Sequence, residues 1–217
     1  MKHSISHFLI AISLSLVTTH ASAIGDDGSV IIVVSDISGN PLPNTVVSLL
    51  PDKAMPSIDP LAIATMAQRD TKFNPHILAI PVGTVVKFPN EDAFRHHIYS
   101  FSKAGPFEIR LYGGDEEKKI KFETAGVVAL GCNIHDSMLA YIYVADTPYV
   151  GKTDENGQIT FHAAAAGTYS VTLWHERMKK MDANYSPSLE VKAGGKIEKT
   201  FSMTLKRKKT KSRKKRY

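Results

Sequence analysis

The sequence predicts an all-β fold. Short runs rich in Val, Ile, Thr, Phe and Tyr recur along the chain, and Gly, Asn and Pro turns separate them. No stretch shows the apolar repeat of a long amphipathic helix. The chain has 217 residues, of which 43% are hydrophobic and 22% charged, the balance of a globular protein that buries a core. We therefore expect a β-sandwich architecture, in one large or two modest domains.

Residues 1–23, MKHSISHFLIAISLSLVTTHASA, have the pattern of a cleaved secretory signal peptide. Lys2 precedes an apolar run over residues 8–17, and small residues stand at Ala21 and Ala23. The apolar run is short for a bilayer span, no second such run follows, and no cysteine is placed for a lipid anchor. We expect an exported protein without a transmembrane segment, periplasmic if the cell is a Gram-negative bacterium.

Two expected strands open the mature chain, VIIVVSD (30–36) and TVVSLL (45–50), on either side of the turn SGNPLPN. Near the other end, QITFH and SVTLWH follow the turn TDENG, and KIEKTFSMTL alternates apolar and polar side chains as a half-buried strand does. These two parts, residues 24–60 and 148–205, resemble the two ends of one carboxypeptidase-regulatory-like, or prealbumin-like, β-sandwich. The resemblance implies that the middle of the chain is a domain inserted into a split one.

The middle block, residues 61–147, contains a further series of expected strands with turns between them. They lie within ILAIPVGTVVKFPN (77–90), HHIYSF (96–101), FEIRLY (107–112), IKFETAGVVALGC (120–132) and MLAYIYVAD (138–146).

The only cysteine of the chain, Cys132, lies in the segment GCNIHDSM, three residues before His135 and six before Met138. A lone cysteine is most often a buried core residue, and in an exported protein it cannot form an internal disulfide. A thiolate, two imidazoles and a weak axial thioether form the ligand set of blue-copper sites. A loop between two strands can turn these three side chains toward one point, so one further imidazole would complete the set.

The segment FPNEDAFRHHIYSF, residues 88–101, supplies that imidazole. Neighbouring side chains on a strand point to opposite faces, so only one of His96 and His97 can reach the site. We expect His96 to be the ligand, because of its distance after the turn at PNED. His97 is the alternative, and otherwise a surface or hydrogen-bonded histidine.

Together, VGTVVKFPNEDAFRHH and GCNIHDSM resemble the cupredoxins, and most closely the bacterial cupredoxin-domain proteins labelled methylamine-utilisation-like or plastocyanin-like. The Cys-x-x-His-x-x-Met loop is similar to that of the short-loop amicyanin and plastocyanin group. The resemblance covers residues 61–147 and implies a Greek-key cupredoxin sandwich with one type 1 copper ion. Carried over position by position, it makes His96, Cys132, His135 and Met138 the metal ligands.

The sequence departs from the family pattern at two positions. His97 stands where plastocyanins often have Asn, and Ile134 stands where a Pro often precedes the second ligand histidine. Asn90 and Asn133 are expected to form turns and to donate hydrogen bonds around the ligands. Asp136 is expected to be a solvated loop carboxylate.

The whole chain has a net charge of +6, and basic residues are concentrated at one end of it. Residues 206–217 hold nine Lys or Arg and no acid, a pattern typical of a disordered tail. With this tail and Lys2 set aside, residues 24–205 hold 17 basic and 21 acidic residues, a net charge of −4. The tail is expected either to be solvated without a partner or to contact anionic lipid or an acidic protein. Export argues against a nucleic-acid partner.

The predicted function is single-electron transfer between redox partners, with no substrate turned over. The family resemblance implies that His135 lies at the exposed edge of the site, where a redox partner docks transiently. Two alternatives stay open. One is a periplasmic copper carrier or sensor. The other is an enzyme in which Cys132 is a nucleophile paired with a histidine, although nothing in the sequence specifies the orienting residue and oxyanion site that such an enzyme needs.

Overall fold

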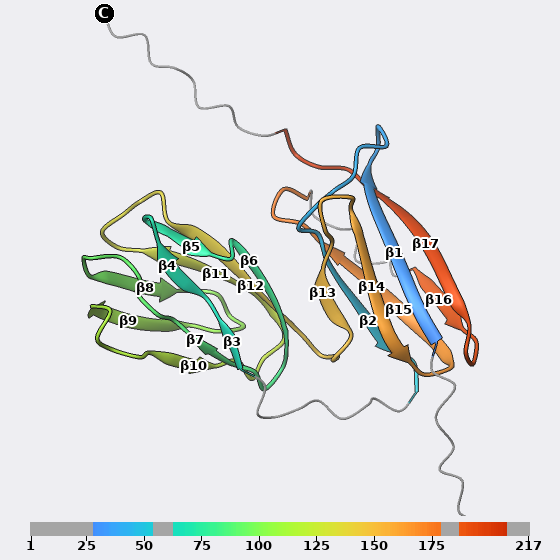
Figure 1. The fold of residues 1–217 in the computed structure, drawn as a ribbon, viewed down its shortest axis with the longest axis horizontal. Coiled ribbons are helices and arrows are strands. Elements are labelled where there is room, and N and C mark those ends of the chain that lie inside the picture. Colours follow the sequence, from blue (N-terminus) through green and yellow to red (C-terminus); the bar gives the residue numbers. More distant parts are fainter. Residues whose placement is uncertain (1–27, 54–62, 179–186, 208–217) are drawn as a thin grey trace, which may run out of the picture.

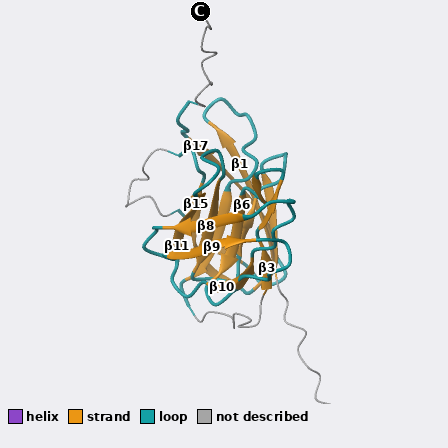
Figure 2. Ribbon diagram, turned by 90° about the vertical axis from the view of Figure 1, so that its left-hand side faces the viewer, coloured by secondary structure: helices purple, strands orange, loops and turns teal. Residues whose placement is uncertain are grey.

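The structure, a computed structural model, describes residues 28–53, 63–178 and 187–207. These residues form the strands β1–β17 and no helix (Figure 2), so the all-β prediction is confirmed. The predicted signal peptide and residues 208–217 of the predicted tail lie outside the described residues. Within the described ranges, no helix has the length and apolar character needed to cross a membrane.

Strands from the two ends of the chain pair with one another and form the flanking region (Figure 1). β1 (Gly28–Asp36) pairs antiparallel with β14 (Gln158–Ala164) and parallel with β17 (Lys196–Met203). A second sheet has the order β13-β2-β15-β16. Apolar side chains from both sheets share one buried cluster. The strands of the second sheet are β2 (Val46–Pro51), β13 (Val150–Lys152), β15 (Gly167–Trp174) and β16 (Ser188–Val191).

The strands between β2 and β13 form the middle region, which has a buried cluster of its own. Its main sheet has the order β6-β12-β11-β8-β9, a smaller sheet has the order β10-β7-β3, and β4 and β5 form a hairpin. The strands of the middle region are β3 (Ile63–Thr65), β4 (Ala67–Arg69), β5 (Lys72–Asn74), β6 (Ile77–Pro81), β7 (Val85–Lys87), β8 (His96–Ser100), β9 (Phe107–Tyr112), β10 (Lys119–Lys121), β11 (Gly126–Cys132) and β12 (Leu139–Ala145).

The alternation of side chains along each strand decides which of them enter the core. In β8 and β11, every second side chain is buried, because successive side chains of a strand point to opposite faces. Ile98 and Leu130 thus enter the cluster, whereas Tyr99 and Ala129 face the other side of the sheet. Burial of such apolar side chains stabilises the fold by roughly 2 kcal/mol each.

The expected strand runs coincide with described strands, with two subdivisions. The run over residues 120–132 is divided into β10 and β11. The run over residues 77–90 is divided into β6 and β7 by a turn at Gly83, whose φ is 90°. The domain boundaries and the prealbumin-like assignment of the flanks stay predictions, and most of the link over residues 51–60 lies outside the described residues.

Aromatic side chains join the two regions. Trp174 of β15 packs edge-on against Tyr141 and lies close to Tyr143, with ring centroids 5.3 and 6.0 Å apart. Beside them, His76 Nε2 lies 2.8 Å from a carboxylate oxygen of Glu176. These contacts give a structural role to Trp174 and His76.

The flanking region depends on a glycine in its TDENG turn. Gly157 has a φ of 71°, and an added Cβ would overlap the backbone oxygen of Val34. We expect Gly157→Ala to lower the free energy of unfolding by about 3 kcal/mol or more, from the left-handed backbone and the overlap together. Gly39→Ala is the matched control, since Gly39 has a φ of 84° but open space around it, and should cost about 1 kcal/mol. Chemical denaturation measures both, and equal losses would contradict the predicted overlap.

Candidate metal centre

Three side chains of the middle region converge on one point: His96, Cys132 and His135. One ligand atom from each lies within 4.8 Å of the others. Cys132 Sγ is 3.8 Å from His96 Nδ1 and 3.9 Å from His135 Nδ1. In the part of the chain that the structure describes, no other group of three His, Cys, Asp or Glu side chains meets this spacing.

The pairing of β8 with β11 brings two of these residues together. The strands are antiparallel, and Cys132 at the end of β11 lies opposite Ile98. His96, two residues before Ile98, points to the same inner face, because side chains alternate along a strand. His96 is fully buried and Cys132 is 4% exposed, so both donor atoms face the interior.

The loop after β11 returns the chain toward the same point. The Asn133 N–H donates to the His97 carbonyl at 3.3 Å, and the Met138 N–H donates to the His135 carbonyl at 2.9 Å. This turn leaves His135 partly exposed and buries Met138, which is 3% exposed and belongs to the core cluster. The loop thus has one accessible imidazole and one buried thioether.

The separations fit a bound metal ion. A metal–sulfur bond of about 2.3 Å and a metal–nitrogen bond of about 2.0 Å, at a trigonal angle, put sulfur and nitrogen about 3.7 Å apart. The two measured distances, 3.8 and 3.9 Å, are close to this value. A thiolate, two imidazoles and a thioether are the donor set of blue-copper sites, so the residues present fit copper.

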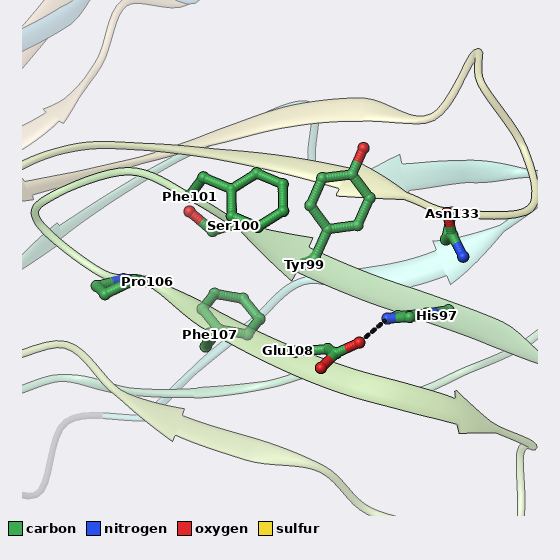
Figure 3. Close-up of a pocket in the computed structure, with 8 residues that line it drawn as sticks. All are labelled: His97, Tyr99, Ser100, Phe101, Pro106, Phe107, Glu108 and Asn133. Atoms are coloured by element: carbon green, nitrogen blue, oxygen red, sulfur yellow. Dashed lines mark ion pairs between the residues drawn. The ribbon is translucent and has the colours of Figure 1, made fainter.

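His97 faces the other side of the sheet. Its Nε2 lies 3.0 Å from a carboxylate oxygen of Glu108, in a groove that Tyr99 and Phe107 also line (Figure 3). The structure therefore places His96, and not His97, beside Cys132. His97 therefore lies beside a carboxylate and away from the thiol.

The second nitrogen of His96 contacts a residue that the sequence analysis missed. His96 Nε2 lies 2.7 Å from Asp92 Oδ2. Asp92 also accepts the N–H groups of Asp70 at 2.7 Å and Thr71 at 3.1 Å, from the turn between β4 and β5. The only signal in the sequence is a carboxylate four residues before the histidine, and the turn that holds it lies more than 20 residues away.

Two opposing effects act on the Asp92 carboxyl. Burial raises its pKa, since the side chain is only 9% exposed. Hydrogen bonds from His96, Thr71 and Asp70 lower the pKa and outweigh burial, so that the net shift is below the usual value for an aspartate. Asp92 is therefore an anion at neutral pH.

Asn90 fixes the loop that carries Asp92. Its side-chain amide donates to the carbonyl of Phe94 at 2.7 Å and to that of Tyr112 at 3.1 Å, while its oxygen accepts the Asp92 N–H at 3.0 Å. Asn90 is thus a turn former and a hydrogen-bond donor near the ligands. By contrast, the side chain of Asn133 is exposed, and so is that of Asp136.

A buried tyrosine lies behind the cluster. The Tyr112 hydroxyl lies within hydrogen-bond distance of two acceptors, the Phe88 carbonyl at 2.8 Å and the side-chain oxygen of Gln68. Burial, with a smaller contribution from the charge of Cys132, raises the pKa of Tyr112 well above its usual value despite the bond to Gln68. This side of the site is therefore neutral, and its polar groups are hydrogen-bonded.

Apolar side chains surround the exposed edge of the cluster. Phe94 is 46% exposed, and its ring centroid lies 5.1 Å from that of His96 and 5.4 Å from that of His135. Ile134, next to His135, is 47% exposed. The partly exposed imidazole thus has two exposed apolar side chains beside it.

Comparison with known proteins adds several solved structures. One is a copper-containing nitrite reductase from Thermus scotoductus SA-01, with 32% identity over 44% of this chain and a TM-score of 0.37. This chain spans 25% of the length of that reductase. Others are a purple cupredoxin from Nitrosopumilus maritimus (24% identity, 38% of this chain and 99% of that chain, TM-score 0.35) and a reduced amicyanin variant (20% identity, 42% and 97%, TM-score 0.35). No family model and no curated protein matches the chain.

One of these structures is named as a cupredoxin. This is the family that the two sequence motifs resemble, and the cluster of His96, Cys132 and His135 is the arrangement that the cupredoxin resemblance implies. The finer labels, methylamine-utilisation-like and carboxypeptidase-regulatory-like, stay predictions.

Asn90 and Asn133 differ in burial, so their variants test whether the buried amide of Asn90 stabilises the fold. We expect Asn90→Ala to lower the free energy of unfolding by about 2–3 kcal/mol, because two carbonyls lose their buried donor. Asn133→Ala is the matched control and should change stability by less than about 0.5 kcal/mol, since its side chain is exposed. Urea denaturation of the full chain compares them, and a loss in Asn90→Ala no larger than in the control would rule out the bracing role.

Proposed function

We propose that this chain is an exported type 1 copper protein that transfers single electrons between redox partners. The observation that supports the proposal is the convergence of His96 Nδ1, Cys132 Sγ and His135 Nδ1 at separations that suit metal ligands. Met138, buried in the same loop, completes the donor set.

The chain's own residues would hold the ion. His96 and Cys132 are fixed on paired strands, while His135 and Met138 come from the loop closed by the hydrogen bond between them. When bound, copper supplies one-electron exchange between Cu(II) and Cu(I). Ligands held by a sheet and a closed loop keep nearly the same positions in both oxidation states, which keeps the reorganisation that accompanies each transfer small.

A partner would dock where His135 meets the solvent. Phe94 and Ile134 give this edge exposed apolar area, and the charged residues Arg95 and Asp136, next in sequence to Phe94 and His135, are also exposed. Apolar surfaces of this limited size suit brief encounters, as between redox proteins. The location that we propose is the periplasm, on the basis of residues 1–23, with the basic tail free to contact anionic lipid or an acidic protein.

The proposal includes no enzymatic turnover. A nucleophilic cysteine needs access to its substrate, whereas Cys132 is 4% exposed and faces two imidazoles. A copper carrier or sensor is the second candidate, because the same ligands serve both functions. The two differ in kinetics: a carrier surrenders copper to an acceptor, whereas an electron-transfer protein retains it through repeated redox cycles.

Copper addition tests the site directly. The full-length protein with Cu(II) should show an intense visible band from thiolate-to-copper charge transfer and the EPR signal of type 1 copper. Cys132→Ala should lose the band completely, because it removes the thiolate. His97→Ala should keep it, because His97 faces the opposite side of the sheet.

The control variant decides between the two histidines. Loss of the band in His97→Ala with retention in His96→Ala would reverse the proposed ligand set. A wild-type protein that gives no band would overturn the proposed function. Copper that passes to a competing chelator after each reduction would favour the carrier alternative.

The proposed docking edge can be tested without knowing the partner. Self-exchange between oxidised and reduced copies requires two His135 edges to meet, so Ile134→Asp should slow it by about tenfold, because like charges would face each other across the contact. Ile37→Asp, at a 74% exposed position in the flanking region, is the matched control and should leave the rate unchanged. NMR line broadening in a mixture of the Cu(I) and Cu(II) forms measures the self-exchange rate. Equal rates for Ile134→Asp and wild type would contradict this docking edge.

A further inference from the structure

The environment of His96 differs from that of the other proposed ligands, because a buried carboxylate holds it. His96 has no exposed surface and the Asp92 side chain is only 9% exposed. One imidazole nitrogen lies 2.7 Å from Asp92 and the other 3.8 Å from the Cys132 sulfur. Each nitrogen of this ring therefore has a separate neighbour of different chemistry.

We propose that Asp92 is a positioning residue that sets the tautomer of His96 and, as a fixed negative charge, lowers the reduction potential of the centre. This inference rests on the proposed copper site. It concerns a residue that contacts a ligand and does not itself face the metal position.

The tautomer follows from the two contacts of the ring. A neutral imidazole carries its proton on one nitrogen and its lone pair on the other, and a metal ligand must present the lone pair. With Asp92 accepting a hydrogen bond from Nε2–H, Nδ1 is left free to bind on the side of Cys132. A carboxylate held at one nitrogen also fixes the orientation of the ring, so that the other nitrogen is positioned for a metal ion.

Asp92 cannot easily turn away from the histidine. Oδ1 accepts the Asp70 N–H at 2.7 Å, and Oδ2 accepts the Thr71 N–H at 3.1 Å as well as facing His96. Both donors belong to a turn whose residues have positive φ, 54° at Asp70 and 57° at Thr71, and this backbone directs both N–H groups at the carboxylate. The Asp92 N–H is itself held by the Asn90 side chain at 3.0 Å.

The sign of the effect on the potential follows from charge. With Cys132 as a thiolate, the oxidised centre has one more positive charge than the reduced centre. A nearby buried anion stabilises the more positive state, because screening by water is weak there. Asp92 should therefore favour Cu(II) over Cu(I), and removal of its charge should make reduction easier.

The test compares variants of the full-length, copper-loaded chain by spectroelectrochemistry. Asp92→Asn keeps the shape of the side chain and an oxygen that can face His96, but removes the charge. We expect the Cu(I):Cu(II) ratio at a fixed electrode potential to rise by about tenfold or more, a positive shift of about 59 mV, with the visible band retained. Asp92→Ala removes the hydrogen bond as well, and should also weaken copper affinity by about 10- to 100-fold.

Asp136→Asn is the matched control. It removes the same charge from the ligand loop, at an exposed position where water screens it. We expect less than about a threefold change in the Cu(I):Cu(II) ratio for this variant. A change in Asp92→Asn no larger than in Asp136→Asn would overturn the proposed effect on the potential.

A second measurement needs no variant. In the ¹⁵N-labelled, Cu(I)-loaded wild-type protein, long-range ¹H–¹⁵N spectra should show His96 protonated at Nε2 and metal-bound at Nδ1. Protonation at Nδ1 would overturn the tautomer assignment even if Asp92 variants fail to fold. A wild-type protein without a copper band would refute the copper site itself and this inference with it, whereas a normal band with an unchanged Asp92→Asn potential would refute the inference alone.

Discussion

The register between β8 and β11 is the constraint on which the metal centre depends. It places Cys132 opposite Ile98 and Gly131 opposite Tyr99, so that Cys132 shares the inner face with His96. A slip of one residue would turn the thiol to the outer face, because side chains alternate along a strand. Gly131 helps to fix this register, since an added Cβ there would lie 2.7 Å from the Tyr99 ring. The Tyr99 side chain can thus lie directly over the strand that ends in the cysteine.

The loop before β8 is held in a different way, by side chains that bind backbone groups. Asn90 and Asp92 contact the main chain of four other positions between them, in the turn after β4, the loop before β8 and the end of β9. Backbone donors and acceptors in paired strands and tight turns have little freedom to move. The loop before β8 is thus held by backbone groups within it and in two other segments, with one direct contact to a proposed ligand, from Asp92 to His96.

The sequence predicts the parts of the site that are local, because a short loop limits where its own residues can point. The spacing of Cys132, His135 and Met138 was sufficient to expect a shared site. The choice of His96 required only the alternation of side chains along one strand, and His96 lies in the cluster with Cys132 and His135. The role of Asp92 was not predictable, since it depends on a hairpin turn more than 20 residues earlier. The same limit applies to the fold: strand runs are local, whereas the parallel pairing of β1 with β17 joins residues 167 positions apart.

The adjacent histidines show why residue type alone does not identify a ligand. Both imidazoles are near a carboxylate, Asp92 for His96 and Glu108 for His97, so polar neighbours do not distinguish them. What differs is the other nitrogen, which for His96 lies beside a buried thiol. Since sheet phase determines that difference, a bulge or shift in β8 would exchange the roles of the two rings without changing a single side chain. The pairing of β8 with β9 does shift register between His96 and Ile98, yet Cys132 stays opposite Ile98, so it is the β11 partner that fixes which ring faces the metal site.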